Sequence, residues 1–133
     1  MEHETAVGQL PEIIYLEGML YSLYTTPLAP WLNNQSPPVV FDRRTSTCER
    51  GYVGKWSVEN DALSLIGLYA WRDGRYTSVR KLFDDRNQVL ADWYTGPLII
   101  QPTTESVREG EYPKSKTLFV EAGHITQSSS INA

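Results

Sequence analysis

The chain has 133 residues, of which 41% are hydrophobic and 11% aromatic, and its 12 basic and 16 acidic side chains give a formal net charge of -4. This length suits one domain, and the apolar content is enough for a core, which excludes a wholly disordered chain. The acidic balance argues against phosphate binding in nucleic acid, and no apolar run is long enough to span a membrane. We expect a single domain over 1–133, with a core at about 12–126 and flexible flanks at 1–11 and 127–133.

The first predicted elements are two short strands joined by a tight turn. An apolar run covers Ile13–Leu16, Glu17-Gly18 suits a turn, and Met19–Tyr24 returns as the second strand. The pattern therefore predicts a β-hairpin near the start of the chain.

An irregular segment, 25–47, follows and holds four of the eight prolines. Pro27 and the apolar spacing after it predict one helical turn that contains Leu28, Trp31 and Leu32 and ends at Asn33-Asn34. A brief strand is predicted at 39–41, before a polar loop.

The stretch Glu49–Tyr69 predicts two paired strands with a turn at Asn60-Asp61. The first strand places Tyr52, Gly54, Trp56 and Val58 on one face. The second strand is apolar on both faces, which is typical of a central strand. We interpret this hairpin as the middle of a β-sheet.

The rest of the chain also predicts strands. Asp73-Gly74 is a strong turn signal, and Trp71 and Tyr76 are expected to pair across it. Residues 77–85 are compatible with a helical turn or a strand. Further strands are predicted at Val89–Thr95, 98–100 and 117–122, with a long exposed loop at 101–115, a turn at Gly123-His124, a short final pairing from Ile125 and a frayed tail.

Turn signals recur about every ten residues, which favours an antiparallel fold. We predict an all-β domain, with one or two short helical turns, whose sheet is curled into a sandwich or small barrel.

Three segments carry a resemblance to a known family. They are Gly18 to Tyr21 followed by Thr26-Pro27-Leu28, the run RGYVGKW at 50–56, and Leu82-Phe83 followed by ADWYTGPL at 91–98. In these segments the chain resembles a family of small, uncharacterised bacterial β-rich proteins, over roughly residues 13 to 125. The resemblance implies a bacterial or phage origin and one compact domain, and it assigns no catalytic residue. Family members usually end in a short charged segment, whereas this chain ends in a Ser-rich tail.

Histidine and cysteine do not form a recognisable catalytic or metal-binding set. His3 and His124 lack partners at the spacing of a metal site or a Ser–His pair. Cys48 is the single cysteine; Arg50 could activate it, but we interpret it as a buried residue at a strand start. We expect no cofactor and no metal. A lone thiol and an acidic N-terminus unlike a secretory signal favour a cytosolic protein.

Asp92 is the most interesting carboxylate because it alternates with apolar residues in a predicted strand. If it is buried it needs a cationic partner, and Arg50 or Lys55 could provide one. We interpret Asp92 as half of an ion pair between strands. The alternative is a ligand-binding or enzymatic pocket lined by Asp92, Tyr94, Tyr52 and Arg50.

Aromatic residues in loops suggest a protein-binding surface. We predict a non-catalytic module that sequesters a partner protein, such as an immunity protein or an inhibitor, and the net charge suggests that the partner could be basic. Trp31 could instead cover the core. A homo-oligomeric structural subunit, for instance of a phage particle, is a third alternative. The residues proposed for partner binding are Trp31, Trp71, Tyr76, Asp84 and Asp85.

Overall fold

The computed structural model describes residues 9–43, 45–103 and 115–130 and consists mainly of strands. In chain order the elements are β1 (Glu12–Leu16), β2 (Met19–Leu23), α2 (Ala29–Asn33), β3 (Tyr52–Glu59), β4 (Ala62–Arg72), β5 (Arg75–Thr77), α3 (Val79–Leu82), β6 (Val89–Leu90), β7 (Gly96–Pro102), β8 (Lys116–Glu121) and β9 (His124–Ser130).

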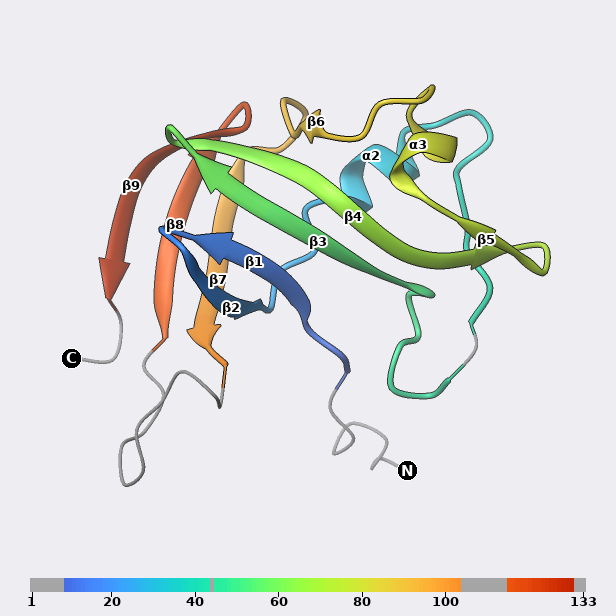
Figure 1. Cartoon of the computed structure of the whole chain (residues 1–133), viewed down its shortest axis with the longest axis horizontal. Coiled ribbons are helices and arrows are strands. Elements are labelled where there is room, and N and C mark those ends of the chain that lie inside the picture. Colours follow the sequence, from blue (N-terminus) through green and yellow to red (C-terminus); the bar gives the residue numbers. More distant parts are fainter. Residues whose placement is uncertain (1–8, 44, 104–114, 131–133) are drawn as a thin grey trace.

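Seven of these strands form a closed barrel (Figure 1). The strand order is β3-β1-β2-β7-β8-β9-β4, and pairing of β4 with β3 closes the ring. All neighbours in the ring are antiparallel except β1 and β3, which run parallel. β5 and β6 pair with β4 along the edge that does not face β3. The predicted all-β small barrel is confirmed.

Four two-residue turns join consecutive strands, and both residues of each turn have positive φ. This backbone matches the right-handed twist of paired strands. The predicted turns at 17–18, 60–61 and 73–74 are confirmed, and the last turn lies at Ala122-Gly123, one residue earlier than predicted.

A β-bulge in β4 explains why that strand is apolar on both faces. Trp56 pairs with Leu65, whereas the preceding Lys55 pairs with Gly67, so Ile66 is an extra residue. The bulge reverses the alternation. Leu63 and Leu65 before it and Leu68 and Ala70 after it are therefore all buried, while Tyr69 is 60% exposed. Both apolar faces of the sequence thus contribute to one interior face.

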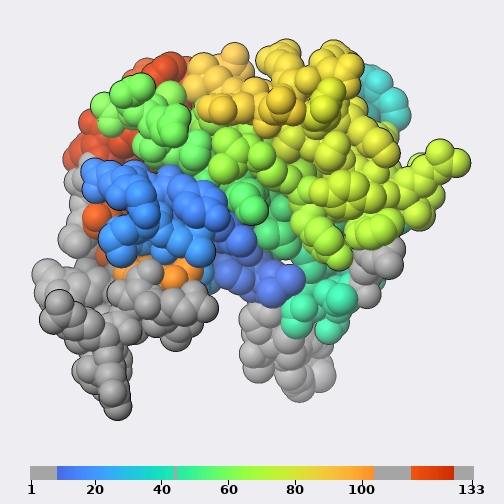
Figure 2. Space-filling model, viewed as in Figure 1, coloured from blue at the N-terminus to red at the C-terminus, as the bar shows by residue number. Residues whose placement is uncertain are grey.

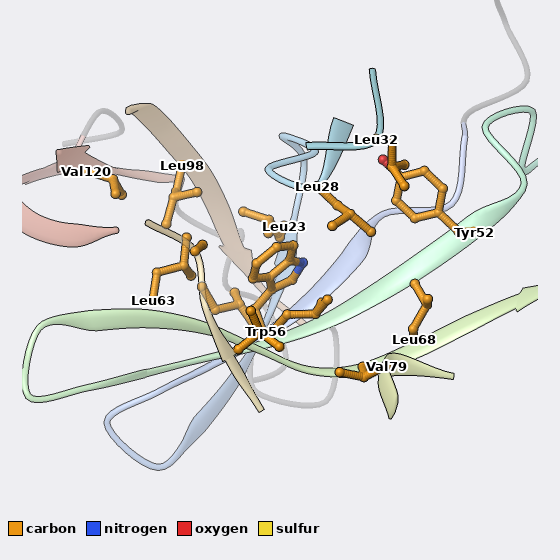
Figure 3. Close-up of a cluster of buried hydrophobic side chains, with 14 of the residues drawn as sticks. Leu23, Leu28, Leu32, Tyr52, Trp56, Leu63, Leu68, Val79, Leu98 and Val120 are labelled. Atoms are coloured by element: carbon orange, nitrogen blue, oxygen red, sulfur yellow. The ribbon is translucent and has the colours of Figure 1, made fainter. Parts of the chain in front are cut away.

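Large apolar side chains fill the barrel. Trp56 is fully buried at its centre, and Figure 3 shows leucines and valines from several strands around the indole. Leu28 and Leu32 extend this core from α2 (Figure 3). A filled interior leaves substrate or partner contacts to the ends and the outer surface of the barrel.

The predicted strand at Val89–Thr95 is wrong beyond its first two residues. The chain pairs with β4 only at Val89-Leu90 and then turns, with Tyr94 N–H donating to Ala91 O at 3.0 Å. The turn lets the indole N–H of Trp93 donate to Pro27 O at 2.8 Å. This tertiary contact outweighs the local alternation.

Other differences concern strand ends. The predicted brief strand at 39–41 is not a strand, and the tail expected to fray from Gln127 instead belongs to β9, which pairs with β8 as far as Ser130. The helical turn predicted after Pro27 is confirmed as α2, and the ambiguous 77–85 segment contains α3. Residues 1–8, 131–133 and most of the predicted 101–115 loop lie outside the described part of the chain.

Candidate functional site

A fully buried carboxylate lies near one end of the barrel. Glu12, at the start of β1, is 0% exposed and accepts hydrogen bonds from the indole N–H of Trp56 and the backbone N–H of Gly54, both at 2.9 Å. The Nε of Arg50 donates to the same carboxylate at 3.3 Å. Three donors from the β3 region thus converge on two oxygens, which satisfies the buried charge and fixes β1 against β3.

Glycine at position 54 makes room for this carboxylate. A Cβ built there would lie 2.9 Å from Glu12 Oε1 and 2.8 Å from Trp56 Nε1. Burial raises the pKa of the Glu12 carboxyl, and the hydrogen bonds from Trp56, Gly54 and Arg50 only partly oppose that rise. The group therefore combines a high desolvation cost with a geometry that suits its ionised form.

Arg50 and Tyr52 lie together, apart from Asp92. The Arg50 guanidinium carbon is 5.3 Å from the centre of the Tyr52 ring. Asp92 follows β6, whose partner residues Ser64 and Leu65 in β4 lie opposite Ser57 and Trp56 of β3. Asp92 is exposed, so the burial that would require a cationic partner is absent, and the acidic partner of Arg50 is Glu12. Within the described residues, no ion pair joins Asp92 to Arg50 or Lys55.

Tyr94 also lies away from Arg50. Its hydroxyl donates to Pro97 O, its backbone oxygen accepts from Gly123 N–H at 3.0 Å, and burial raises its pKa. Arg50 and Tyr52 thus lie beside Glu12, whereas Asp92 and Tyr94 lie in the turn after β6, because the strand that would have carried Asp92 and Tyr94 does not continue beyond Leu90.

The outer face of β4 and β5 carries a group of aromatic rings, which we call the hairpin cluster: Tyr69, Trp71 and Tyr76. The ring centres of Tyr76 lie 6.4 Å from Tyr69 and 5.8 Å from Trp71. Tyr69 is 60% and Tyr76 44% exposed. The predicted pairing of Trp71 with Tyr76 across the turn is confirmed, and Figure 2 shows the hairpin extending from the body of the molecule.

Asp42 holds the end of this hairpin in place. Its carboxylate accepts hydrogen bonds from the backbone N–H groups of Asp73 at 3.1 Å and Gly74 at 2.8 Å, and its own N–H donates to Trp71 O at 2.7 Å. The tyrosines are also fixed, since the Tyr76 hydroxyl donates to Leu68 O at 2.9 Å. The hairpin cluster is therefore an ordered, exposed apolar surface.

A small hollow of about 140 Å³ adjoins the hairpin cluster. Tyr69 and Trp71 form one side of it, and Cys48 and Leu10 form part of the other. The Cys48 thiol donates to Tyr52 O at 3.3 Å. Cys48 is partly buried in the loop before β3, whereas the sequence predicts a buried residue at the start of a strand.

Trp31 belongs to a different group, which we call the covered cluster: Trp31, Phe83 and Trp93. The ring centre of Phe83 lies 4.4 Å from Trp31 and 5.9 Å from Trp93. Trp31 packs against the buried core, which is the alternative role considered for it. Asp84 and Asp85 are exposed in the loop after α3. The five predicted partner-binding residues thus fall into two groups: Trp71 and Tyr76 lie in the hairpin cluster, whereas Asp84 and Asp85 directly follow Phe83, whose ring packs on Trp31.

Other candidate chemistry is limited. His124 is exposed beside the β8–β9 turn, and His3 lies outside the described residues. Within the described ranges, no group of three or more His, Cys, Asp or Glu side chains could hold a metal ion. None of the helices described is long and apolar enough to cross a membrane.

Sequence reasoning missed Glu12, although a signal for it exists. Glu12 shares the alternation of Ile14 in a strand whose inner face is apolar, so a carboxylate at that position predicts a buried polar group.

Comparison of the chain with known protein families, curated proteins and solved structures found no match.

Proposed function

We propose that this protein is a non-catalytic binding module that holds a partner protein against the hairpin cluster, as an immunity protein or an inhibitor would. The observation that carries the proposal is an ordered group of rings on the outside of a barrel whose interior is filled: Tyr69 and Tyr76 are exposed, and Trp71 is half-buried beside them. Exposed apolar groups of this kind mark interaction sites more often than isolated ones do.

The rings suit a protein partner because they are already ordered. Tyrosine and tryptophan are common among the residues that dominate binding energy at interfaces. Asp42 and the Tyr76 hydroxyl bond restrict the hairpin before any partner arrives, so little side-chain freedom remains to be lost on binding. The adjoining hollow could accept one apolar side chain of the partner.

Local charge favours an acidic partner, in contrast to the basic partner suggested by the net charge. Lys55, on the same outer face as Tyr69, is exposed, and Arg72 and Arg75 are exposed at the end of the hairpin. Asp73 lies between these two arginines and the Asp42 carboxylate binds the turn, so three cationic side chains stand against two acidic ones. Such a surface complements an acidic segment and would increase its association rate at low salt.

Contact through side chains is favoured over strand addition. β5 is a three-residue strand at the end of the sheet order, and the Lys81 amine donates to Tyr76 O at 3.2 Å. A lysine on the outer carbonyl obstructs an incoming strand. The partner would therefore bind on the ring face.

The test is quantitative affinity capture from the organism that encodes the protein. Captured proteins are expressed, and their Kd values are measured against wild type and against a Tyr69→Ala/Tyr76→Ala variant. The matched control is Tyr15→Ala/Met19→Ala, which removes two exposed apolar side chains from β1 and β2. The expected result is at least tenfold weaker binding for the hairpin variant and unchanged binding for the control.

Charge gives a second readout. An Arg72→Gln/Arg75→Gln variant is expected to weaken binding most at low salt. A partner that binds all variants equally, or the absence of any partner that binds in purified form, would refute the proposal. A self-association that the hairpin variant abolishes would instead favour the homo-oligomeric alternative.

A further inference from the structure

Arg50 lies between two hollows at one end of the barrel. A cleft of about 550 Å³ is lined in part by Leu10, Pro11, Leu23 and Tyr24, and a neighbouring hollow of about 260 Å³ is lined in part by α2. Thr26 and Arg50 line both. The larger volume falls in the range of pockets that hold small molecules, and this cleft is separate from the hairpin cluster.

The guanidinium of Arg50 is fixed but not saturated. Its Nε donates to Glu12, and its carbon lies over the Tyr52 ring. Its Nη2 is buried and has no hydrogen-bond partner among the residues described. An unsatisfied donor of this kind is costly and is rare in folded proteins. The side chain as a whole remains 18% exposed and lines the cleft, so a ligand there would meet its exposed part, while Nη2 itself is shielded.

The charge around Arg50 is already balanced. Glu12 accepts three hydrogen bonds from donors, an arrangement that suits its ionised form. Glu49 is a second acidic residue in the lining of the cleft. A ligand carboxylate would meet both of these charges, whereas an uncharged oxygen could accept from Arg50 without repulsion.

We propose that this cleft binds a small uncharged molecule through a carbonyl oxygen that accepts a hydrogen bond from Arg50. The rest of the ligand would be apolar or aromatic and would pack against Tyr24 and Leu23. Glu12 acts as a positioning residue, because it holds the guanidinium through Nε and leaves the other nitrogens for the ligand.

The experiment uses three probes with the same ring and different charge: benzamide, benzoate and benzylamine. Each is titrated into ¹⁵N-labelled protein to millimolar concentrations, and the Trp56 indole N–H and Arg50 Nε–H signals are followed. Both groups donate to Glu12, so a ligand at Arg50 should perturb them together. Saturable shifts are expected with benzamide, with at least fivefold weaker binding of benzoate and benzylamine.

Variants locate the site. Arg50→Gln is expected to weaken benzamide binding at least tenfold, and Arg72→Gln, with the same loss of charge elsewhere, should leave it unchanged. If Arg50→Gln does not fold, Tyr24→Ser serves instead, because Tyr24 is 53% exposed and its loss should weaken binding without disturbing the core.

Three results would overturn the proposal: no saturable shift with any probe, tighter binding of benzoate than of benzamide, or binding that neither cleft variant weakens. The Tyr69→Ala/Tyr76→Ala variant should bind benzamide as wild type does. Failure of the cleft and failure of the hairpin cluster as a partner site are therefore separate outcomes.

Discussion

The covered cluster and the hairpin cluster have similar ring geometry and opposite surroundings. In the covered cluster the three pairs of ring centres lie 4.4 to 6.2 Å apart, and in the hairpin cluster the Tyr76 ring lies 5.8 and 6.4 Å from the other two. In the covered cluster, Trp93 is bonded to the chain before α2 and the rings complete the core. In the hairpin cluster, Tyr69 and Tyr76 face solvent. Ring packing alone therefore does not distinguish a structural cluster from a surface available to a partner. The two are distinguished by whether other parts of the chain cover the rings.

The largest effect expected from this comparison is that of Trp93→Ala. Loss of the indole removes its contacts with Phe83 and Trp31 and leaves Pro27 O without its donor. We expect a loss of about 3 kcal/mol in the free energy of unfolding, measured by urea denaturation.

Two controls make this result specific. Asp92→Ala, one residue earlier and exposed, and Tyr69→Ala, in the hairpin cluster, should each change stability by no more than about 0.5 to 1 kcal/mol. Equal losses for Trp93→Ala and Tyr69→Ala would show that the two clusters do not differ in the way described.

Glu12→Gln tests whether the covered interior tolerates a change that preserves shape. A glutamine can accept from only one side-chain oxygen, and its NH₂ would face a donor from Trp56, Gly54 or Arg50. We expect a loss of about 2 kcal/mol at neutral pH.

The pH dependence of this loss has a defined sign. The pKa of Glu12 is raised in the folded state, so the folded protein binds more protons than the unfolded chain between the ordinary carboxyl pKa and the raised value. The stability that Glu12 contributes is complete below that window and decreases as pH rises through it. The difference between wild type and Glu12→Gln should therefore be larger at pH 4.5 than at pH 7 when unfolding is measured at both; the reverse order would contradict a raised pKa.

Asp42→Ala should have the smallest effect and should act on the hairpin cluster alone. It removes two hydrogen bonds to the turn, at Asp73 and Gly74. We expect a loss of about 1 kcal/mol and faster hydrogen exchange at these two amides. Glu59→Ala, an exposed change on β3, is the control. If exchange at the turn does not change, Asp42 does not order the hairpin.

The sequence predicts the strands well where turns are encoded locally. Glu17-Gly18, Asn60-Asp61 and Asp73-Gly74 adopt the positive φ that two-residue hairpins require, and the strands on either side follow. The helical turn after Pro27 is also found from a local signal, although the proline within the first turn of α2 is Pro30, and Pro27 precedes the N-cap residue Leu28.

The misses arise from contacts between distant segments. A strand at Val89–Thr95 satisfies alternation, but Trp93 binds Pro27, 66 residues away in sequence. The bulge at Ile66, by contrast, lies next to Gly67, which pairs with Lys55, so a local signal for it is present in the sequence. Alternation alone does not include the contact of Trp93 with Pro27.

The candidate sites show the same division. Trp71 and Tyr76 are adjacent across a predicted turn, so their pairing follows from sequence, whereas the cleft depends on β1 lying parallel to β3, which brings Glu12 to Arg50 across 38 residues. The sequence points to Asp92 only if residues 89–95 form one strand, and they do not. The partner of Glu12 cannot be identified from spacing, because Arg50 lies far from it in the sequence.

The pairing between β4 and β9 determines where the barrel can open locally. It consists of the single pair Ala62 and His124, flanked by bonds from Leu63 N–H to Gly123 O and from Ile125 N–H to Asp61 O. β3 and β4, by contrast, pair along their whole length. Transient separation of β4 from β9 would expose Leu118 and Val120 to water while the other strands of the ring stay paired. The ring should therefore open most easily between β4 and β9, where its neighbouring strands share the fewest paired residues.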